Sequence, residues 1–386
     1  MIALVMGRGV EGCGVTRYTI EYKNWLEKQG KEVVVYALKE KSFSRGKAQI
    51  FDYKIFTPDD DISGELNECE YVVYMSVPST TNSKKGIDNF VENCVYKVKV
   101  KKIFIQHDHK RQSLQRNARM LEIIDKCDIT FTHCTNSDFG ELYRKEFNSL
   151  FETRNLYEFK IGLDFEQFTK FRKQFSEKID RASYFGRFAR FKHPQRVLDL
   201  RKHLKGKIIT EMRGLERSIG ALDIYNHPDI IEVKKGQDIK QDCFDKTYVY
   251  GPYDRDEGME EVSKSKFGCS FYELDARAYG NHVEFAMLEI VGLGLIPIFS
   301  KHWGDNTKHI SGKPFSQVDN SGIYLEFRKQ DKVCINIDEV CNEIIKLNNN
   351  ENLYNDYVDK CIEVYKQHSS TDVAFQDLQK TIGEIL

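Results

Sequence analysis

The sequence predicts an α/β protein of two domains, each a parallel sheet wound with helices. Three observations lead to this fold class. Short apolar runs alternate with amphipathic helical segments along most of the chain, as in strand–helix–strand units. The alternation breaks once, between about residues 150 and 181, and then restarts. The length of 386 residues allows a sizeable core in each half.

In the first half, the apolar run 2–6 predicts a strand, and large apolar side chains at helical spacing predict a helix over 16–29. Gly30 ends that helix. Runs of unbroken apolar character favour a parallel sheet covered on both faces. The further strands are expected at 33–38, 71–75, 103–106 and 128–133, with helices around 87–95 and 114–121 between them.

The second half repeats the alternation after the charged and aromatic stretch 150–181, which we interpret as the inter-domain connection. Its strands are expected at 182–185, 207–210, 247–250, 267–271 and 295–299, and its helices at 283–293, 337–347 and 353–367. A last helix over 371–385 is expected to cross back to the first domain. We therefore expect two Rossmann-like domains, 1–165 and 180–368, facing a deep cleft, with residues 369–386 as the crossing segment.

Composition excludes several classes of protein. The chain is 40% hydrophobic and 30% charged with seven prolines, which is typical of a folded soluble protein rather than a disordered or collagenous one. No apolar run approaches the roughly 20 residues of a membrane span, and the first run is too short for a signal peptide. With 58 Lys and Arg against 59 Asp and Glu, the net charge of −1 argues against binding to nucleic acid by overall charge.

The ten cysteines contain no CxxC pair, and their spacing fits neither a zinc site nor a disulfide framework. Most of them fall in apolar periodic segments. We therefore expect reduced thiols in or near the core of a cytoplasmic protein. Cys13 differs only in lying within a glycine-rich loop.

That loop follows the first strand. Gly7, Gly9 and Gly12 match G-x-G-x-x-G between a strand and a helix, where backbone N–H groups and the helix dipole favour a phosphate. A dinucleotide site also needs an acidic residue at the end of the second strand, and the first one here is Glu40, beyond that strand. A nicotinamide site is therefore disfavoured, and a tight turn that simply requires glycine is the structural alternative.

Polar residues follow the strand 103–106. His107, Asp108 and His109 stand at its carboxyl end, where open α/β sheets bind ligands. A histidine and an aspartate offer a proton acceptor and a charge partner for a sugar or a hydroxyl group. An HxH pair is often structural, and this one lacks the third ligand expected of a metal site.

The most uneven charge in the sequence surrounds these residues. Such a run is usually a solvated helix face, but around a site it could hold the phosphates of a polyanionic substrate. We expect it to form a basic rim around the strand end. Positions 97 to 119 contain one acidic residue, Asp108, and eight basic residues: Lys97, Lys99, Lys101, Lys102, Lys110, Arg111, Arg116 and Arg119.

In the second domain, the strand 182–185 runs into Gly186 and Arg187, and Lys192 follows five residues later. An arginine and a lysine on one short loop can hold a diphosphate leaving group without a metal. Taken alone, this spacing is not specific.

The helix 283–293 carries two carboxylates, Glu284 and Glu289, ahead of a glycine-rich turn into an apolar strand. A carboxylate at this place can accept both hydroxyl groups of a ribose. The structural alternative for either residue is an exposed position on the helix. The position directly before the turn favours a function for Glu289.

Taken in order, these motifs resemble the DNA α-glucosyltransferases of T-even bacteriophages, which are nucleotide-sugar glycosyltransferases of the GT-B type. The resemblance runs through both domains and is poor from about 150 to 180. It is carried by the segments 6–17 (MGRGVEGCGVTR), 41–43 (KSF), 106–109 (QHDH), 214–218 (GLERS), 263–268 (SKSKFG), 288–289 (LE) and 296–297 (IP).

The resemblance implies a retaining transfer of a sugar from a UDP-sugar to the hydroxyl group of 5-hydroxymethylcytosine in duplex phage DNA. The target base must leave the stack to reach the pocket. Glucose is the default sugar, but segment 272–282 fits the family pattern badly near the sugar-reading region, so UDP-arabinose stays open. A lipid or glycan acceptor and a non-catalytic DNA-binding protein are the further alternatives.

The resemblance also implies residue roles. The first domain would receive the DNA and the second would bind the UDP-sugar, with no tightly bound cofactor and with a divalent metal allowed but not required by the motifs. The protein would be a monomer in the cytoplasm of the infected bacterial host, without a membrane partner. The implied residues are His107 and Asp108 beside the reacting groups; Gly12, Gly14, Arg187, Lys192, Glu284 and Glu289 around the donor; and Lys110, Arg111, Arg116 and Arg119 on the DNA.

Overall fold

A computed structural model of the chain divides into two compact units. Unit 1 is formed by the described residues of Met1–Leu163 and of Thr371–Leu386, and unit 2 by those of Asp164–Asp275 and of Val283–Ser370. The structure describes residues 1–7, 14–38, 53–75, 84–107, 119–133, 155–186, 188, 192–204, 206–214, 227–233, 237, 244–250, 255–272, 283–328 and 333–385.

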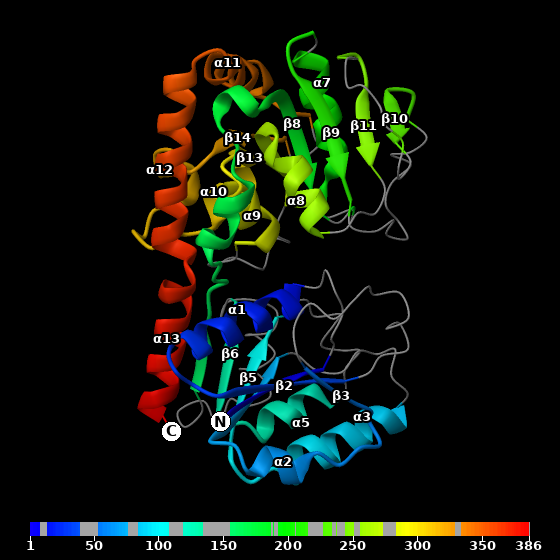
Figure 1. Cartoon of the computed structure of the whole chain (residues 1–386), viewed down its shortest axis with the longest axis vertical. Coiled ribbons are helices and arrows are strands. Elements are labelled where there is room, and N and C mark those ends of the chain that lie inside the picture. The colour runs from blue at the N-terminus through cyan, green and yellow to red at the C-terminus, as the bar shows by residue number, and fades with distance from the viewer. Residues whose placement is uncertain are drawn as a thin grey trace. The chain divides into compact units, whose positions relative to one another are not determined.

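Unit 1 contains a seven-stranded sheet in the order β3-β2-β1-β4-β5-β6-β7, in which every pairing is parallel (Figure 1). The central strands are buried along their length because helices cover both faces. The strands are β1 (Ile2–Met6), β2 (Val33–Leu38), β3 (Lys54–Phe56), β4 (Tyr71–Met75), β5 (Lys101–Gln106), β6 (Ile129–Thr132) and β7 (Asn155–Glu158).

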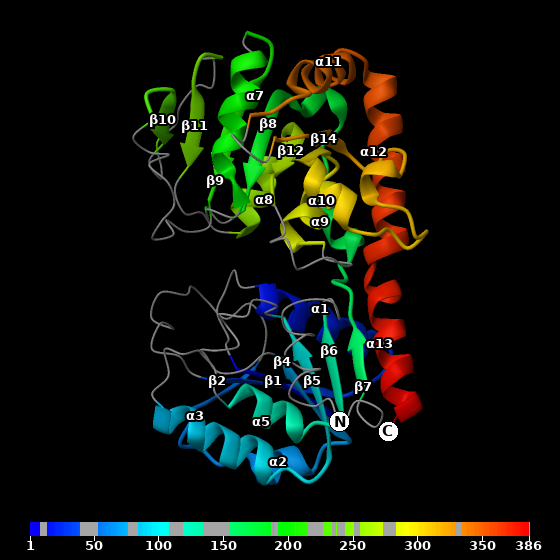
Figure 2. The same cartoon turned by 180° about the vertical axis from the view of Figure 1, so that it is seen from behind.

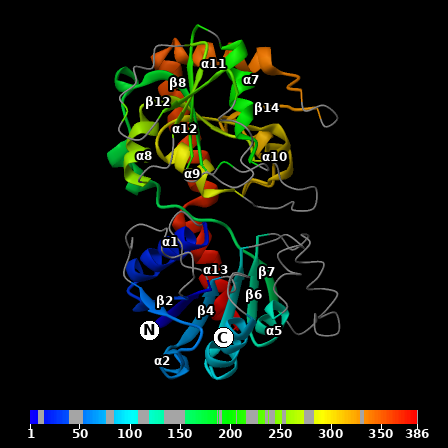
Figure 3. The same ribbon diagram turned by 90° about the vertical axis from the view of Figure 1, so that its right-hand side faces the viewer.

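Helices α1 (Gly14–Lys28) and α13 (Thr371–Ile385) pack together on unit 1, as Figure 3 shows. Trp25 Nε1 donates a hydrogen bond to Asp372 Oδ1 at 2.8 Å, and the Phe375 ring packs against Tyr18 and Tyr22. A second group of helices packs on this sheet and encloses a large apolar cluster. These helices are α2 (Ser63–Asn67), α3 (Lys84–Val91), the π-helical turn η2 (Glu92–Tyr96) and α5 (Met120–Asp125).

Unit 2 contains a second seven-stranded parallel sheet, in the order β10-β11-β9-β8-β12-β13-β14. Strand order reverses between β8 and β12, which is the switch point where such sheets bind ligands. The strands are β8 (Ile179–Phe185), β9 (Ile209–Arg213), β10 (Ile230–Val233), β11 (Thr247–Tyr250), β12 (Ser265–Ser270), β13 (Ile296–Ser300) and β14 (Ile323–Leu325).

Helices α7 (Val197–His203) and α11 (Ile337–Asn348) lie together over this sheet and share its apolar core (Figure 2). Right-handed crossovers that run in the other direction place α8 (Arg255–Ser263), α9 (Phe285–Gly292) and α10 (Lys301–Asn306) on the opposite face. The long helix α12 (Glu351–Ser369) packs against α9 and α11.

The prediction that 150–181 is only a connection is wrong in part. Strand β7, the last strand of the first sheet, lies within it, and β8 begins before its end. Two 3-10 helices, η4 (Phe165–Phe171) and η5 (Phe175–Glu177), fill the interval, and Phe165 and Phe168 are buried. The four-residue edge strand NLYE has no long apolar run, so the hydrophobic pattern of the sequence does not identify it as a strand.

Every cysteine in the described part of the chain is a free thiol, and six of these seven are buried. This agrees with the prediction for these residues, while Cys13, Cys134 and Cys243 lie outside the described residues. Among the described helices, none has both the length and the apolar character needed to cross a membrane.

Candidate active site

The structure describes half of the site residues that the sequence predicts. Gly14, His107, Arg119, Lys192, Glu284 and Glu289 are described, whereas Gly12, Asp108, Lys110, Arg111, Arg116 and Arg187 lie outside the described residues. The described ones fall into two groups, one on each unit.

In unit 1, His107 directly follows β5 at the carboxyl edge of the sheet. Its ring packs edge-on against Tyr18 of α1, Phe159 and His133, with centroid distances of 4.8, 5.1 and 5.7 Å. The Nε2 atom of His107 is buried, and no described residue offers it a hydrogen bond. An unpaired buried nitrogen at a ligand-binding edge is costly unless a ligand or a neighbouring segment completes it.

Burial lowers the pKa of His107 to about 3. The imidazole is therefore neutral near pH 7 and has one ring nitrogen free to accept a hydrogen bond. The Tyr18 hydroxyl is also buried without a hydrogen-bond partner among the described residues, and burial raises the pKa of Tyr18, so it stays a donor. The two groups together can orient a hydroxyl group that approaches this edge.

Sequence reasoning missed Tyr18, His133 and Phe159. His133 follows β6 at the same edge as His107, and Thr132 before it is buried with an unpaired hydroxyl among the described residues. A polar residue after each of two neighbouring parallel strands was a usable signal for His133. Tyr18 gave no such signal, because its spacing on α1 is that of an ordinary core residue.

Gly14 is the first residue of α1, at the end of the glycine-rich loop. A Cβ atom built at this position would meet no described atom within 4 Å. Packing within the described chain therefore does not require glycine here. Space free of described atoms beside the first turn of a helix would allow a phosphate to approach the backbone closely.

In unit 2, the Nζ atom of Lys192 lies 2.7 Å from Oε2 of Glu284, and both side chains are mostly buried. Glu284 is the residue directly before α9, and Lys192 comes seven positions after the last residue of β8. Gly186, which directly follows β8, has a φ of +140° that favours glycine. Two residues predicted separately for donor binding thus meet in one ion pair.

Glu289 lies on α9 and is 8% exposed. Neither Glu284 nor Glu289 is therefore an exposed helix residue, which removes the structural alternative that the sequence left open. Helix α9 lies very close to β12, since a Cβ atom at Gly268 would come within 2.4 Å of Ile290 Cγ2. This close approach fixes the position of both carboxylate-bearing residues relative to the sheet.

The basic rim expected around His107 is wrong for four of its eight members. Lys97, Lys99, Lys101 and Lys102 lie at the amino end of β5, a whole strand away from His107. Two of them are in ion pairs, Lys97 with Asp61 at 2.8 Å and Lys101 with Asp128 at 3.3 Å. These four residues cannot hold a substrate at the carboxyl edge of the sheet.

Arg119, at the start of α5, is also held by carboxylates. Its Nε donates to Glu122 Oε2 at 2.6 Å, and its Nη1 donates to Asp88 Oδ1 at 2.9 Å. Within the described residues, moreover, no group of three or more His, Cys, Asp or Glu side chains is arranged to hold a metal ion.

Comparison with known proteins gives one consistent result. A family model described as DNA alpha-glucosyltransferase matches residues 13–344. The DNA alpha-glucosyltransferase of Enterobacteria phage T4 is 28% identical, with 97% of this chain and 98% of that protein covered.

Solved structures match over the same extent. An alpha-glucosyltransferase in complex with UDP-glucose and DNA containing an abasic site superimposes with a TM-score of 0.89 at 27% identity, over 99% of each chain. An alpha-glucosyltransferase with UDP and a 13-mer DNA containing an HMU base gives a TM-score of 0.88 at 26% identity, again over 99% of each chain.

Proposed function

The chain belongs to the DNA α-glucosyltransferase family, and we propose that it transfers glucose from UDP-glucose to the hydroxymethyl group of 5-hydroxymethylcytosine in duplex DNA. The observation that carries this proposal is the match over nearly the whole chain to relatives solved with UDP-glucose and DNA. The transfer retains the configuration of the anomeric carbon. The target base leaves the duplex stack, because its hydroxymethyl group must reach the sugar.

Four of the six proposed donor residues belong to unit 2. Lys192 and Arg187 neutralise the diphosphate, because cationic side chains bind leaving phosphates through charge-assisted hydrogen bonds. Glu289 accepts the ribose hydroxyls, and Glu284 lies beside the donor through its pair with Lys192. Gly12 and Gly14, which belong to unit 1, let backbone N–H groups approach the phosphates. The 2.7 Å ion pair supports the assignment of Lys192 and Glu284 to one site.

The acceptor residues His107 and Asp108 belong to unit 1. As the acceptor oxygen bonds to the anomeric carbon, the bond from that carbon to the diphosphate breaks, and the departing phosphate takes the acceptor proton. His107, neutral because its pKa is about 3, orients the acceptor hydroxyl rather than carrying charge. Lys110, Arg111 and Arg116 are the proposed phosphate contacts to DNA, and Arg119 would join them only by leaving Asp88 and Glu122.

We propose that the UDP-sugar is a co-substrate and that no cofactor is permanently bound. The protein would act as a monomer in the cytoplasm of an infected bacterium, where phage DNA is the substrate. No membrane partner is proposed.

The test is a transfer assay with a panel of UDP-sugars on hydroxymethylated duplex DNA, read by mass spectrometry of the released nucleosides. We expect a glucosylated nucleoside, and none from matched DNA with unmodified cytosine. Transfer of arabinose would replace the sugar in the proposal, and transfer only to a lipid or glycan would refute it. Stabilisation by UDP in a thermal melt separates an enzyme from a pure DNA-binding protein, which UDP would leave unchanged.

A further inference from the structure

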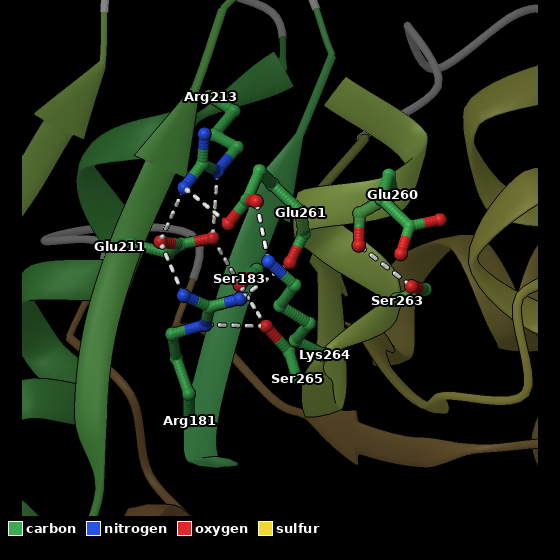
Figure 4. Close-up of polar contacts among 9 residues, drawn as sticks. All are labelled: Arg181, Ser183, Glu211, Arg213, Glu260, Glu261, Ser263, Lys264 and Ser265. Carbon is green, nitrogen blue, oxygen red and sulfur yellow. Dashed lines mark hydrogen bonds and ion pairs between the residues drawn. The ribbon is translucent and has the colours of Figure 1, made fainter. Parts of the chain in front are cut away.

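A buried ionic network lies on the α8 side of the second sheet (Figure 4). We call Arg181, Ser183, Glu211, Arg213 and Ser265 the Glu211 network. Its members alternate along β8 and β9 and thus point to one face of the sheet, with Ser265 on β12 beside them.

Glu211 is the centre of this network. Its carboxylate lies 3.2 Å from Nη1 of Arg181, and it accepts hydrogen bonds from Arg213 Nε at 3.0 Å and from Ser183 Oγ at 2.7 Å. Burial alone would raise the pKa of Glu211, but the two guanidinium groups outweigh burial and lower it to about 2. The side chains of all three charged residues are at most 7% exposed.

The two arginines are not equivalent. Arg181 is used entirely within the interior: its Nε donates to Ser265 Oγ at 2.6 Å and its Nη2 to the Glu261 carbonyl at 2.5 Å. Arg213 stacks on the Tyr250 ring at 3.8 Å, and no described acceptor bonds its Nη1. Arg181 therefore bonds groups of the interior, whereas Nη1 of Arg213 is available to donate a hydrogen bond to a ligand.

The Glu211 network contains one more positive than negative charge. Glu211 can neutralise one of the two buried guanidinium groups, so the three charges sum to +1. The next carboxylate, Glu261, is 4.0 Å from Arg213 but pairs with Lys264 at 2.5 Å. Because a surplus buried charge is costly, an anion beside Arg213 would be favourable.

Arg213 also lies at the edge of the sheet where a UDP-sugar is expected to bind. It is the last residue of β9, at the carboxyl end of the sheet, where Figure 4 shows it beside the arrowhead. Its carbonyl accepts the N–H of Gly186 at 3.1 Å, and the Phe188 ring packs against Gly214. The end of β9 therefore contacts the first residues after β8, in the segment that continues to Lys192, a proposed diphosphate residue.

We infer that Arg213 is a further residue that binds the UDP-sugar. Glu211 and Tyr250 hold its guanidinium, and its Nη1 donates a hydrogen bond to the diphosphate. Arg181, the other arginine of the network, has only a structural role. This inference rests on the proposed function, because it assumes that unit 2 binds a nucleoside diphosphate.

The test compares Arg213→Gln with Arg181→Gln as its matched control, using calorimetric titration of the full chain with UDP. Each substitution removes one guanidinium and leaves Glu211 paired with the other. We expect Arg213→Gln to bind UDP about tenfold more weakly or worse, while Arg181→Gln binds like the wild type. Uridine, which lacks phosphates, should bind the wild type and Arg213→Gln alike.

Unchanged UDP affinity in Arg213→Gln would overturn the inference, and so would an equal loss in both variants or an equal loss for uridine. Failure of the wild type to bind UDP would instead refute the proposed function. If either glutamine variant does not fold, Arg213→Lys and Arg181→Lys take their places. A lysine ammonium lacks the planar fork of a guanidinium and cannot bond Glu211 and a ligand at the same time. UDP binding should therefore weaken about threefold or more in Arg213→Lys and not in Arg181→Lys.

Discussion

The ammonium group of Lys192 lies 2.7 Å from the carboxylate of Glu284, although 92 positions separate the two residues in the chain. The pair joins Lys192, in the segment that follows β8, to the residue before α9, and only about a seventh of each side chain is exposed. A diphosphate that binds Lys192 must therefore compete with Glu284 for the same cation. This competition can be measured.

Replacing Glu284 with glutamine should strengthen the binding of UDP alone by roughly threefold, because a negative charge beside the diphosphate is lost and Lys192 is released. Lys192→Met should weaken UDP binding about tenfold or more, because it removes a charge-assisted contact. Calorimetric titration measures both. Lys346→Met, which breaks the exposed pair with Glu343, is the control and should change nothing. Weaker UDP binding by Glu284→Gln would contradict the competition.

The folded protein should lose stability in acid through His107. Its pKa of about 3 lies below the roughly 6.5 of an unfolded histidine, so between these values the unfolded chain takes up a proton that the folded chain excludes. The free energy of unfolding therefore falls as pH falls from about 6.5 towards 3. In His107→Gln the drop between pH 7 and pH 5 should be smaller by about 1–2 kcal/mol, after allowance for the partial exposure of the residue. Denaturant titrations at the two pH values test this, and parallel curves for both proteins would count against it.

Glu211→Gln should be strongly destabilising, by roughly 3–5 kcal/mol, because it leaves two buried guanidinium groups without their carboxylate. The matched variant Glu261→Gln removes a carboxylate that is 37% exposed and should cost less than about 1 kcal/mol. Urea unfolding at pH 7 compares the two. Equal losses would show that the Glu211 network does not depend on its central charge.

Gly268→Ala should move α9 away from β12, because the new Cβ atom would lie 2.4 Å from Ile290 Cγ2. We expect a loss of roughly 1–3 kcal/mol together with weaker UDP binding, since α9 positions Glu289, the proposed ribose-binding residue. Gly383→Ala in α13 is the control: its Cβ atom meets no described atom, and it should stabilise the helix by about 0.5–1 kcal/mol. Thermal melts with and without UDP give both quantities, and an unshifted melt for Gly268→Ala would disprove the constraint.

The sequence by itself was sufficient to predict the interior strands of both sheets. Strands β1, β2, β4 and β11 have the predicted bounds, because a buried parallel strand must be apolar throughout and this leaves a visible run. All four edge strands, β3, β7, β10 and β14, were missed. An edge strand has only one neighbour, is short and is partly exposed, so local hydrophobicity does not identify it.

The strand-end rule likewise placed His107 after β5 and Gly186 after β8, at the carboxyl edges of the two sheets, because the polarity of a parallel strand follows directly from chain direction. It also explains the error over Lys97–Lys102: residues before a strand lie at the opposite edge from those after it, however close they are in the sequence.

Only the tertiary structure could decide which polar groups meet and which are buried. The Lys192–Glu284 pair, the Tyr18–His107 contact and the Arg181–Glu211 pair each join residues from different elements. Local periodicity reports which face of an element is apolar, but desolvation and ion pairing depend on what another part of the chain brings to that face.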